Sequence, residues 1–329
     1  MPNPHDKLFK LALGSPKDVA LELRAVLPPA HAANIDFESL TPEPDTFLDD
    51  AIKGSYADLL YTVRYRKREA LLYVLFEHKS RPQRFTLLQL LRYMVRIWEK
   101  YLNKKPRPST LPPVIPVVVY HSDKGRSPPT HFHSLFDPDL MSDPELARLT
   151  PAFEARLDDI GHLSDEALRA RAMGPEATLG LVFLRDARRN ERILEDFTHW
   201  AGQFHTLMAT PEGERAARQL FSYLFMVAPS LDFEKLTQRV QRDIPETENL
   251  VMTLAEKLIK QGKLEGRQEG RQEGRQEGCR SLVRRQIELK FGQLGTDALA
   301  RLDAADEDAL IRYSERVLTA MSVEEVLGE

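Results

Sequence analysis

One stretch decides the fold: ADLLYTVRYRKREALLYVLFEHK, at residues 57–79. Its first part, residues 57–65, alternates between apolar and polar side chains with the period of two that a half-buried strand requires. The basic segment 66–69 indicates a turn, and residues 70–76 are a nearly continuous apolar run. A run of that length between turn signals is typical of a strand buried on both faces. The stretch therefore predicts a β-hairpin whose second strand lies inside a sheet.

A strong helix pattern follows at residues 85–103. Apolar residues recur at helical spacing and form one stripe, which we expect to face the core: Leu88, Leu91, Val95, Trp98 and Leu102. The opposite stripe is polar and basic, with Gln89, Arg92, Arg96 and Lys100. A further buried strand is predicted at residues 114–120, where Pro116 indicates a sheet edge or a bend because proline has no N–H to donate.

Helices are also predicted near the N-terminus, over residues 5–27. Ser15 is a plausible N-cap before Pro16, and Pro28 ends this region. Residues 34–40 are expected to form a short strand, so the order is α, β, β, β, α, β. From about residue 150 the pattern is mainly helical, with no strand candidate like the earlier ones and no metal-ligand cluster, phosphate loop or nucleophile motif. These patterns predict an α/β fold with a mainly helical C-terminal half.

A four-residue repeat occupies residues 262–278: Gly-Lys-Leu-Glu, then Gly-Arg-Gln-Glu three times, and a closing glycine. On a helix the glycines form one stripe, the glutamines the opposite one, and the arginines and glutamates two more. Each glycine weakens a helix by up to about 1 kcal/mol relative to alanine. The repeat therefore makes sense as a flexible tether, or as a helix packed on a partner through its glycines, and we favour the partner slightly.

Composition indicates a soluble globular chain with two domains, or one domain and an extension. The chain has 329 residues, 42% of them hydrophobic and 29% charged, and no apolar run approaches the roughly 20 residues that span a bilayer. The N-terminus shows no secretory signal, and the single cysteine, Cys279, excludes an intrachain disulfide. We therefore expect a cytoplasmic protein that has no membrane partner.

The net charge of −4 is unevenly distributed. Residues 61–107 hold thirteen Lys and Arg against three acids, Glu69, Glu77 and Glu99, so this segment carries about +10. Such a basic zone is the electrostatic footprint of a protein that binds phosphates. On charge alone, a solvated strand-and-helix surface is an equally good interpretation.

Three side chains at the ends of the hairpin strands have the chemistry of a phosphodiester-cleaving site. Asp58 begins the first strand, and Glu77 and Lys79 end the second, where alternation places them on one face. Carboxylates are ligands that Mg²⁺ prefers, and a lysine can orient the attacking water. The hairpin brings Asp58 beside Glu77 if its turn sets that register. The carbonyl of His78 would face the site as a further ligand.

Taken alone this pattern is weak, because an ordinary Glu–Lys pair at a strand end has the same spacing. The following helix adds weight, since Gln89, Arg92 and Arg96 share one of its faces a few residues after the site. The amide of Gln89 suits the scissile phosphate or a metal-bound water, and the arginines suit backbone phosphates. A solvated polar face is the alternative, more so for Arg96 than for Gln89.

Several segments together resemble one known family. They are His5-Asp6-Lys7-Leu8-Phe9-Lys10, Asp58-Leu59-Leu60-Tyr61, Leu75-Phe76-Glu77-His78-Lys79-Ser80, Gln89-Leu90-Leu91-Arg92-Tyr93-Met94 and Val118-Val119-Tyr120-His121. Over about residues 4–260 the chain looks like the family of recombination-promoting nucleases, or putative transposases. That family belongs to the PD-(D/E)XK nuclease superfamily, so the resemblance implies a restriction-endonuclease-like αβββαβ core.

The resemblance also implies an Mg²⁺-dependent DNA endonuclease linked to recombination or mobile elements, with Mn²⁺ as an alternative metal. Asp58 and Glu77 would be metal ligands, Lys79 would position the water, and Gln89 would be an auxiliary site residue. Many members of the family carry Gln where this chain has Lys79, and the lysine restores the superfamily's E-x-K form. DNA contacts are expected from Arg81, Arg84, Arg92 and Arg96.

The role of Asp6 is open: it is a helix N-cap, which we prefer, or it lies near the site. We expect the nuclease-like core at residues 1–145, a helical region at 146–261, the repeat at 262–278 and a small helical domain at 279–329. Self-association is expected through the C-terminal helices. The alternative to an enzyme is a non-catalytic DNA-binding or oligomeric accessory protein that retains the nuclease fold.

Overall fold

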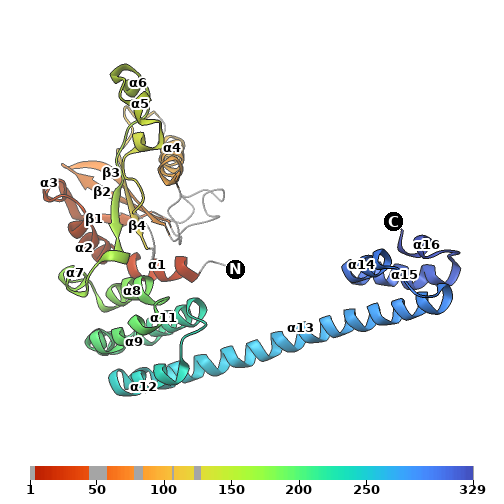
Figure 1. The fold of residues 1–329 in the computed structure, drawn as a ribbon. Helices are drawn as coiled ribbons and strands as arrows, with labels where there is room; N and C mark the ends of the chain where they lie inside the picture. Colours follow the sequence, from red (N-terminus) through yellow and green to blue (C-terminus); the bar gives the residue numbers. More distant parts are fainter. Residues whose placement is uncertain (1–3, 44–57, 78–83, 106, 122–126, 329) are drawn as a thin grey trace. The chain divides into compact units, whose positions relative to one another are not determined.

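A mixed five-stranded sheet has the strand order β1-β2-β3-β4-β5 (Figure 1). The structure is a computed structural model, and it describes residues 4–43, 58–77, 84–105, 107–121 and 127–328. The first three strands, β1 (Ile35–Pro42), β2 (Asp58–Tyr65) and β3 (Arg68–Glu77), pair antiparallel to one another in sequence order. The last two, β4 (Val114–Tyr120) and β5 (Arg156–Asp159), run parallel to β3. The amino end of β2 therefore lies at the same end of the sheet as the carboxyl ends of β3, β4 and β5.

The predicted hairpin is confirmed. β2 and β3 pair from Asp58 opposite Leu75 to Tyr65 opposite Arg68, which leaves Arg66 and Lys67 in the turn. Both turn residues have positive φ, 48° and 66°, as the twist of a two-residue hairpin favours. Because the turn has a fixed length, it sets the register of the whole hairpin.

The elements up to β4 follow the predicted order, beginning with α1 (Pro4–Leu13) and α2 (Pro16–Val26). A third, short helix, α3 (Pro29–Ala32), was not predicted. Ser15 occupies the N-cap of α2, although its side chain makes no capping hydrogen bond. Asp6 lies in the first turn of α1 and not at its N-cap, because the helix already begins at Pro4.

The helix predicted at residues 85–103 is α4 (Thr86–Lys104), but it is rotated from the predicted orientation. Its buried face packs on the sheet through Leu87, Leu90, Met94 and Ile97. The stripe that we expected to face the core is partly exposed: Leu88 is 51% exposed, Val95 43% and Leu102 45%. The two stripes are offset by one residue, or about 100° around the helix. Because both are apolar, periodicity alone did not distinguish them.

The strand that contains Pro116 is β4, which lies between β3 and β5. β5 was not predicted, because four residues are too few for a clear alternation. It pairs with β4 only from Val117 onward, so Pro116 stands just before the point where β5 joins the sheet. The missing N–H of the proline is tolerated there.

The face of the sheet opposite α4 packs on a layer of helices that includes α1, α2 and α8 (Pro175–Asp186) (Figure 1). Tyr61 and Val119 from the sheet share this core with Phe9 of α1. Helices α1 and α8 approach closely at Gly180, where an added Cβ would lie 2.7 Å from the Cβ of Ala12. Only glycine permits that approach without a shift of the helices.

A buried ion triad fixes β5 to this layer. Arg171 donates hydrogen bonds to both carboxylate oxygens of Asp158 in β5, at 2.7 and 2.9 Å, and a further one to Glu22 of α2. All three residues are buried. Burial, followed by the neighbouring charge of Asp158, raises the pKa of Glu22 well above its ordinary value.

The chain as a whole divides into two compact units, Met1–Leu254 and Ala255–Glu329. The part that follows β5 is mainly helical, as predicted. The other helices of the chain are α5 (Pro138–Met141), α6 (Pro144–Leu149), α7 (Asp165–Ala170), α9 (Asn190–His199), α10 (Ala201–Met208), α11 (Gly213–Val227), α12 (Phe233–Asp243), α13 (Glu248–Phe291), α14 (Thr296–Ala304), α15 (Glu307–Thr319) and α16 (Val323–Leu327). No helix among the described residues combines the length and the apolar character needed to cross a membrane.

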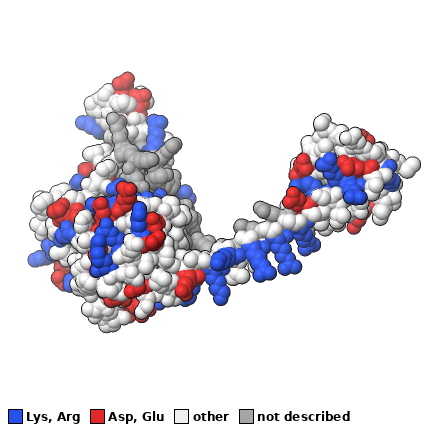
Figure 2. Space-filling view, turned by 60° about the horizontal axis from the view of Figure 1, so that its bottom comes forward, with Lys and Arg blue, Asp and Glu red and all other residues white. Residues whose placement is uncertain are grey.

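The Gly-Arg-Gln-Glu repeat is helical and forms part of α13. Its Lys and Arg side chains form a row along the helix (Figure 2). An added Cβ at Gly262, Gly266, Gly270, Gly274 or Gly278 would meet nothing within 4 Å. The glycine stripe is therefore open within the described chain, and its partner stays a prediction.

Candidate active site

Asp58 and Glu77 come from neighbouring strands at one end of the sheet. In the register of the hairpin Asp58 lies opposite Leu75, so Glu77 is its diagonal neighbour and not its direct partner. Diagonal positions on an antiparallel pair lie about 7–8 Å apart, within reach of a shared ligand. The side chains of both residues fall outside the described part of the structure, as do His78, Lys79 and Arg81 entirely. Their assigned roles therefore remain predictions.

Strand alternation places both positions on the face of the sheet that α4 covers. Leu60 in β2 and Leu71 in β3 pack in the same cluster as the buried face of α4. Residue 58 is two positions from Leu60 in β2, and residue 77 is six positions from Leu71 in β3. Because alternate residues of a strand point to the same face, each acidic position lies on the same face as the leucine of its strand. The backbone thus brings both acidic positions to the side of the sheet that faces the basic helix.

Positions 58 and 77 begin a row of polar residues across the end of the sheet, which we call the sheet-end row. Two polar residues that the sequence analysis did not assign to the site extend it. Tyr120 of β4 is level with Glu77, and Asp159 of β5 is level with Tyr120. Tyr120 is fully buried, yet its hydroxyl has no hydrogen-bond partner among the described residues. A buried polar group left without a partner costs about 1–3 kcal/mol. Such a group at the end of the sheet, next to an acidic position, indicates a place where a polar ligand or water belongs.

Asp159 shows the same feature on one of its oxygens. Its Oδ2 accepts a hydrogen bond from Ser127 Oγ at 2.5 Å and lies 3.0 Å from His162 Nδ1. Its Oδ1 is buried and has no hydrogen-bond partner in the part of the chain that the structure describes. The sequence signals for Tyr120 were its place at the end of an apolar strand and in a segment that resembles the family, and Asp159 had none because β5 itself was missed.

Two of the predicted residues on α4, Gln89 and Arg92, line a cavity of about 730 Å³. Its described lining residues are Arg84, Phe85, Leu88, Gln89, Leu91 and Arg92. Gln89 is half-buried, and its Nε2 donates a hydrogen bond to the hydroxyl of Tyr93 at 2.6 Å. The structure therefore groups Gln89 with Arg84 and Arg92, whereas Arg96 is not among the residues that line this cavity.

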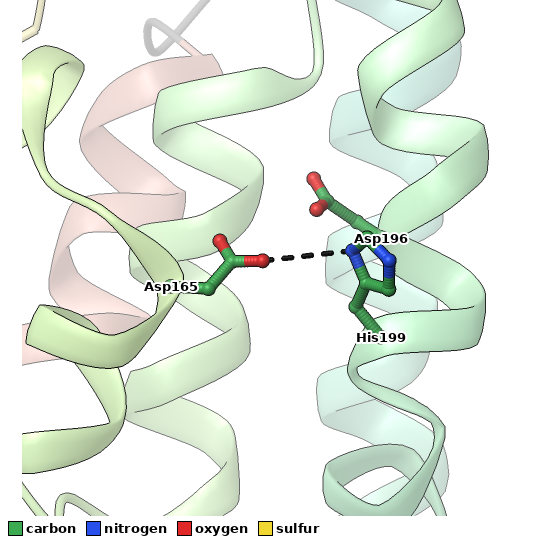
Figure 3. A group of neighbouring side chains, drawn as sticks. All are labelled: Asp165, Asp196 and His199. Atoms are coloured by element: carbon green, nitrogen blue, oxygen red, sulfur yellow. Dashed lines mark ion pairs between the residues drawn. The ribbon is translucent and has the colours of Figure 1, made fainter.

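A second polar cluster, which the sequence analysis missed, lies among the helices. Asp165 of α7 and Asp196 and His199 of α9 offer ligand atoms within 4.8 Å of one another (Figure 3). Asp165 Oδ2 lies 3.6 Å from His199 Nδ1. The available signal was the spacing of Asp196 and His199, which places two ligand types on one helical face.

Two arginines already neutralise this cluster. Asp165 Oδ1 accepts hydrogen bonds from Arg185 and Arg192 at 2.6 and 2.7 Å, and Arg192 Nε lies 3.5 Å from Asp196 Oδ1. Burial alone would raise the pKa of Asp165, but hydrogen bonds and charge from the two arginines outweigh it and lower that pKa. Guanidinium groups at these distances oppose a bound cation. We therefore interpret the cluster as an ion-pair network that joins α7, α8 and α9.

Asp196 carries an unusual charge state within this network. Its side chain is 2% exposed and lies beside the carboxyl group of Asp186. Burial, reinforced by the neighbouring Asp186, raises the pKa of Asp196 to about 8. The carboxyl group is therefore largely protonated at neutral pH, which also makes it a poor metal ligand.

The fold and the sheet-end row define an α/β protein with a candidate active site beside a basic helix. The chain belongs to the family of YhgA-like putative transposases, whose model matches residues 3–215. It is 29% identical to the recombination-promoting nuclease RpnA of Escherichia coli K12, over 79% of this chain and 85% of the relative.

Two further relatives have contrasting names. The recombination-promoting nuclease RpnD of Escherichia coli O157:H7 is 27% identical, over 78% of this chain and 94% of its own length. The inactive recombination-promoting nuclease-like protein RpnE of Escherichia coli K12 is 25% identical, over 79% of this chain and 83% of its own length. No solved structure matches the chain.

Proposed function

We propose that this chain is a metal-dependent DNA endonuclease that acts in recombination. Two lines support the proposal: the chain belongs to a family with relatives named recombination-promoting nucleases, and positions 58 and 77 share the face of the sheet that α4 covers. The second observation carries most weight, because it concerns this chain's own residues. The element order also agrees with the αβββαβ order of PD-(D/E)XK nucleases, which is the fold that we propose for the core.

The row at the end of the sheet fits a hard divalent cation. Asp58, Glu77 and the carbonyl of His78 would hold Mg²⁺, or Mn²⁺ in its place, through oxygen atoms that such ions prefer. Tyr120 and Asp159, which follow Glu77 across the strand register, each have a buried oxygen with no hydrogen-bond partner among the described residues, and these oxygens would hold metal-bound waters. The bound ion would polarise the phosphate and lower the pKa of a bound water.

The chain's own residues would then position the reaction. Lys79 orients the attacking water, while Gln89 binds the scissile phosphate or a metal-bound water. Arg81, Arg84, Arg92 and Arg96 hold neighbouring phosphates of the strand. The water oxygen bonds to phosphorus, the bond to one deoxyribose oxygen breaks, and that oxygen takes a proton. One water is consumed, and the products are a phosphomonoester end and a hydroxyl end.

Plasmid nicking tests the proposal. Supercoiled DNA should be nicked by the protein with Mg²⁺, and chelation by EDTA should stop it. Glu77→Gln and Asp58→Asn should each reduce the rate at least about 100-fold, as expected for loss of a group that acts directly in catalysis. Glu99→Gln is the matched control, because it removes an exposed acid from the same basic segment. Equal nicking by Glu77→Gln and the wild type would exclude the proposed centre.

The relative named inactive favours a second candidate, a DNA-binding accessory protein that keeps the fold without cleavage. It predicts DNA affinity that falls steeply with salt and no product with any divalent metal. A gel that resolves both bound and nicked plasmid distinguishes the two candidates in one experiment.

A further inference from the structure

Helix α4 has a second apolar stripe, offset from its buried face, in which Leu91 and Trp98 pack partly on the core but other residues are exposed. Phe85, at the N-cap, is 54% exposed, and Leu88, one turn later, is 51% exposed. Single exposed apolar residues are ordinary on a protein surface. Here they adjoin one another and line a cavity of about 730 Å³, which is within the usual size range of ligand sites. The exposed stripe is therefore suited to a ligand that has an apolar face.

Charges around the cavity restrict what that ligand can be. Arg84 and Arg92 line it, and the Arg84 guanidinium lies 5.6 Å from the centre of the Phe85 ring. From residue 84 to 105 the helix region holds six basic residues and a single acid, Glu99. A second copy of α4 on this stripe would bring these like charges together, so self-association here is disfavoured. A polyanion with flat apolar groups fits both properties.

Unpaired nucleotides have this combination of chemistry. Their bases expose flat π-faces that stack on aromatic and guanidinium groups, and each carries a phosphate. A closed double helix hides those faces inside its stack and offers only groove edges and phosphates. Phe85 at the N-cap also has no oxygen to cap the first turn of α4, which leaves a helix N-terminus suited to a phosphate.

We propose that the α4 cavity binds an unpaired base, with Phe85 as the stacking platform, Leu88 as its apolar neighbour and Arg84 and Arg92 on the phosphates. The preferred substrate of the proposed nuclease is then single-stranded DNA, or duplex DNA with unpaired nucleotides. This substrate preference rests on the proposed function, whereas binding of the base does not.

Oligonucleotide binding in EDTA tests the site without cleavage. Fluorescence anisotropy compares a labelled 20-nucleotide oligo-dT with a blunt duplex of the same length. The wild type should bind the single strand more tightly. Phe85→Ala should weaken single-strand binding at least about fivefold, from the usual energy of one stacked base, and duplex binding less than about twofold. Phe85→Trp should retain single-strand binding because it keeps a stacking ring.

Val95→Ala is the matched control, because Val95 is an exposed apolar residue on α4 outside the cavity. It should change neither affinity. Equal loss of single-strand and duplex binding by Phe85→Ala would overturn the proposal, as would tighter binding of the duplex by the wild type. If Phe85-dependent binding is found but no metal supports cleavage, the base site stands and the proposed nuclease function fails.

Discussion

Tyr120 in β4 and Asp159 in β5 are partners in the register of two parallel strands, and each has a buried oxygen that finds no hydrogen-bond partner among the described residues. Tyr120 is one strand away from Glu77 and Asp159 is two strands away, at the end of the sheet where β2 begins. Native proteins rarely leave buried polar atoms without partners, because each costs about 1–3 kcal/mol. Two of them in neighbouring positions mark this end of the sheet as a place prepared for polar ligands.

Tyr120→Phe tests this relationship. It removes the hydroxyl and leaves the ring, so in EDTA we expect the free energy of unfolding to stay the same or rise by about 1 kcal/mol. Urea unfolding measures this change. In the proposed nuclease, the Mg²⁺ concentration for half-maximal nicking should rise several-fold. The increase in melting temperature that Mn²⁺ produces in the wild type should shrink in the variant.

A loss of more than about 1 kcal/mol in EDTA would contradict this prediction, because it would show that the hydroxyl already has a stabilising partner. Tyr65→Phe is the control for loss of a tyrosine hydroxyl elsewhere in the sheet, at the far end of β2. It should change neither the stability nor the metal dependence.

Asp196→Asn should stabilise the protein at high pH. The pKa of Asp196 is raised from 3.8 to about 8 by burial and by Asp186, so in this window the folded state holds a proton that the unfolded chain releases. The stability that the protonated Asp196 gives to the folded state is therefore complete below about pH 4 and is lost as pH rises toward 8. Asparagine resembles the protonated acid but does not titrate, so the variant does not lose stability at this position as pH rises. Its melting temperature should therefore exceed that of the wild type at pH 8.

Glu195→Gln is the control for this pH dependence, because Glu195 is an exposed acid on the same helix. Its melting temperature should follow that of the wild type across the pH range. A lower melting temperature for Asp196→Asn at pH 8 would show that Asp196 is ionised there and that the network needs its charge.

Arg171→Met should destabilise the first unit by about 3–5 kcal/mol, the usual cost of removing one partner from a buried ion pair. The change leaves the carboxylates of Glu22 and Asp158 buried without their guanidinium. Thermal and urea unfolding measure the loss. Arg148→Met removes an exposed ion pair with Glu145 and should cost less than about 1 kcal/mol. Similar effects of both substitutions would show that the triad does not anchor β5.

Alanine substitution tests the glycine stripe of α13. Gly266→Ala and Gly270→Ala together should raise the helix content measured by circular dichroism, because alanine favours helix by up to about 1 kcal/mol per site. Nothing within 4 Å opposes the added Cβ atoms in the chain itself. If the partner of the stripe is a second copy of the chain, the same change weakens self-association measured by light scattering.

Gln268→Ala and Gln272→Ala are the matched control, because these residues form the opposite stripe of the same helix. They should leave the mass unchanged. A self-associating wild type whose mass the glycine substitutions do not alter would exclude the stripe as the contact.

The sequence by itself determined most elements of this protein, although it missed the short α3 and β5. Alternation between residues 58 and 65 and the apolar run after residue 69 predict the hairpin, because the period of a strand is a local property of the chain. The helical periods before β1 and after β3 are local in the same way. The acidic positions 58 and 77 could therefore be placed at the strand ends from the sequence.

Only the tertiary structure decided how these elements face one another. The rotation of α4, which buries Leu90 and exposes Leu88, depends on which of two apolar stripes the sheet accepts. The row from Glu77 through Tyr120 to Asp159 depends on pairing between strands far apart in the chain. Register and rotation are set by contacts between distant segments, and a local pattern of residues does not contain that information.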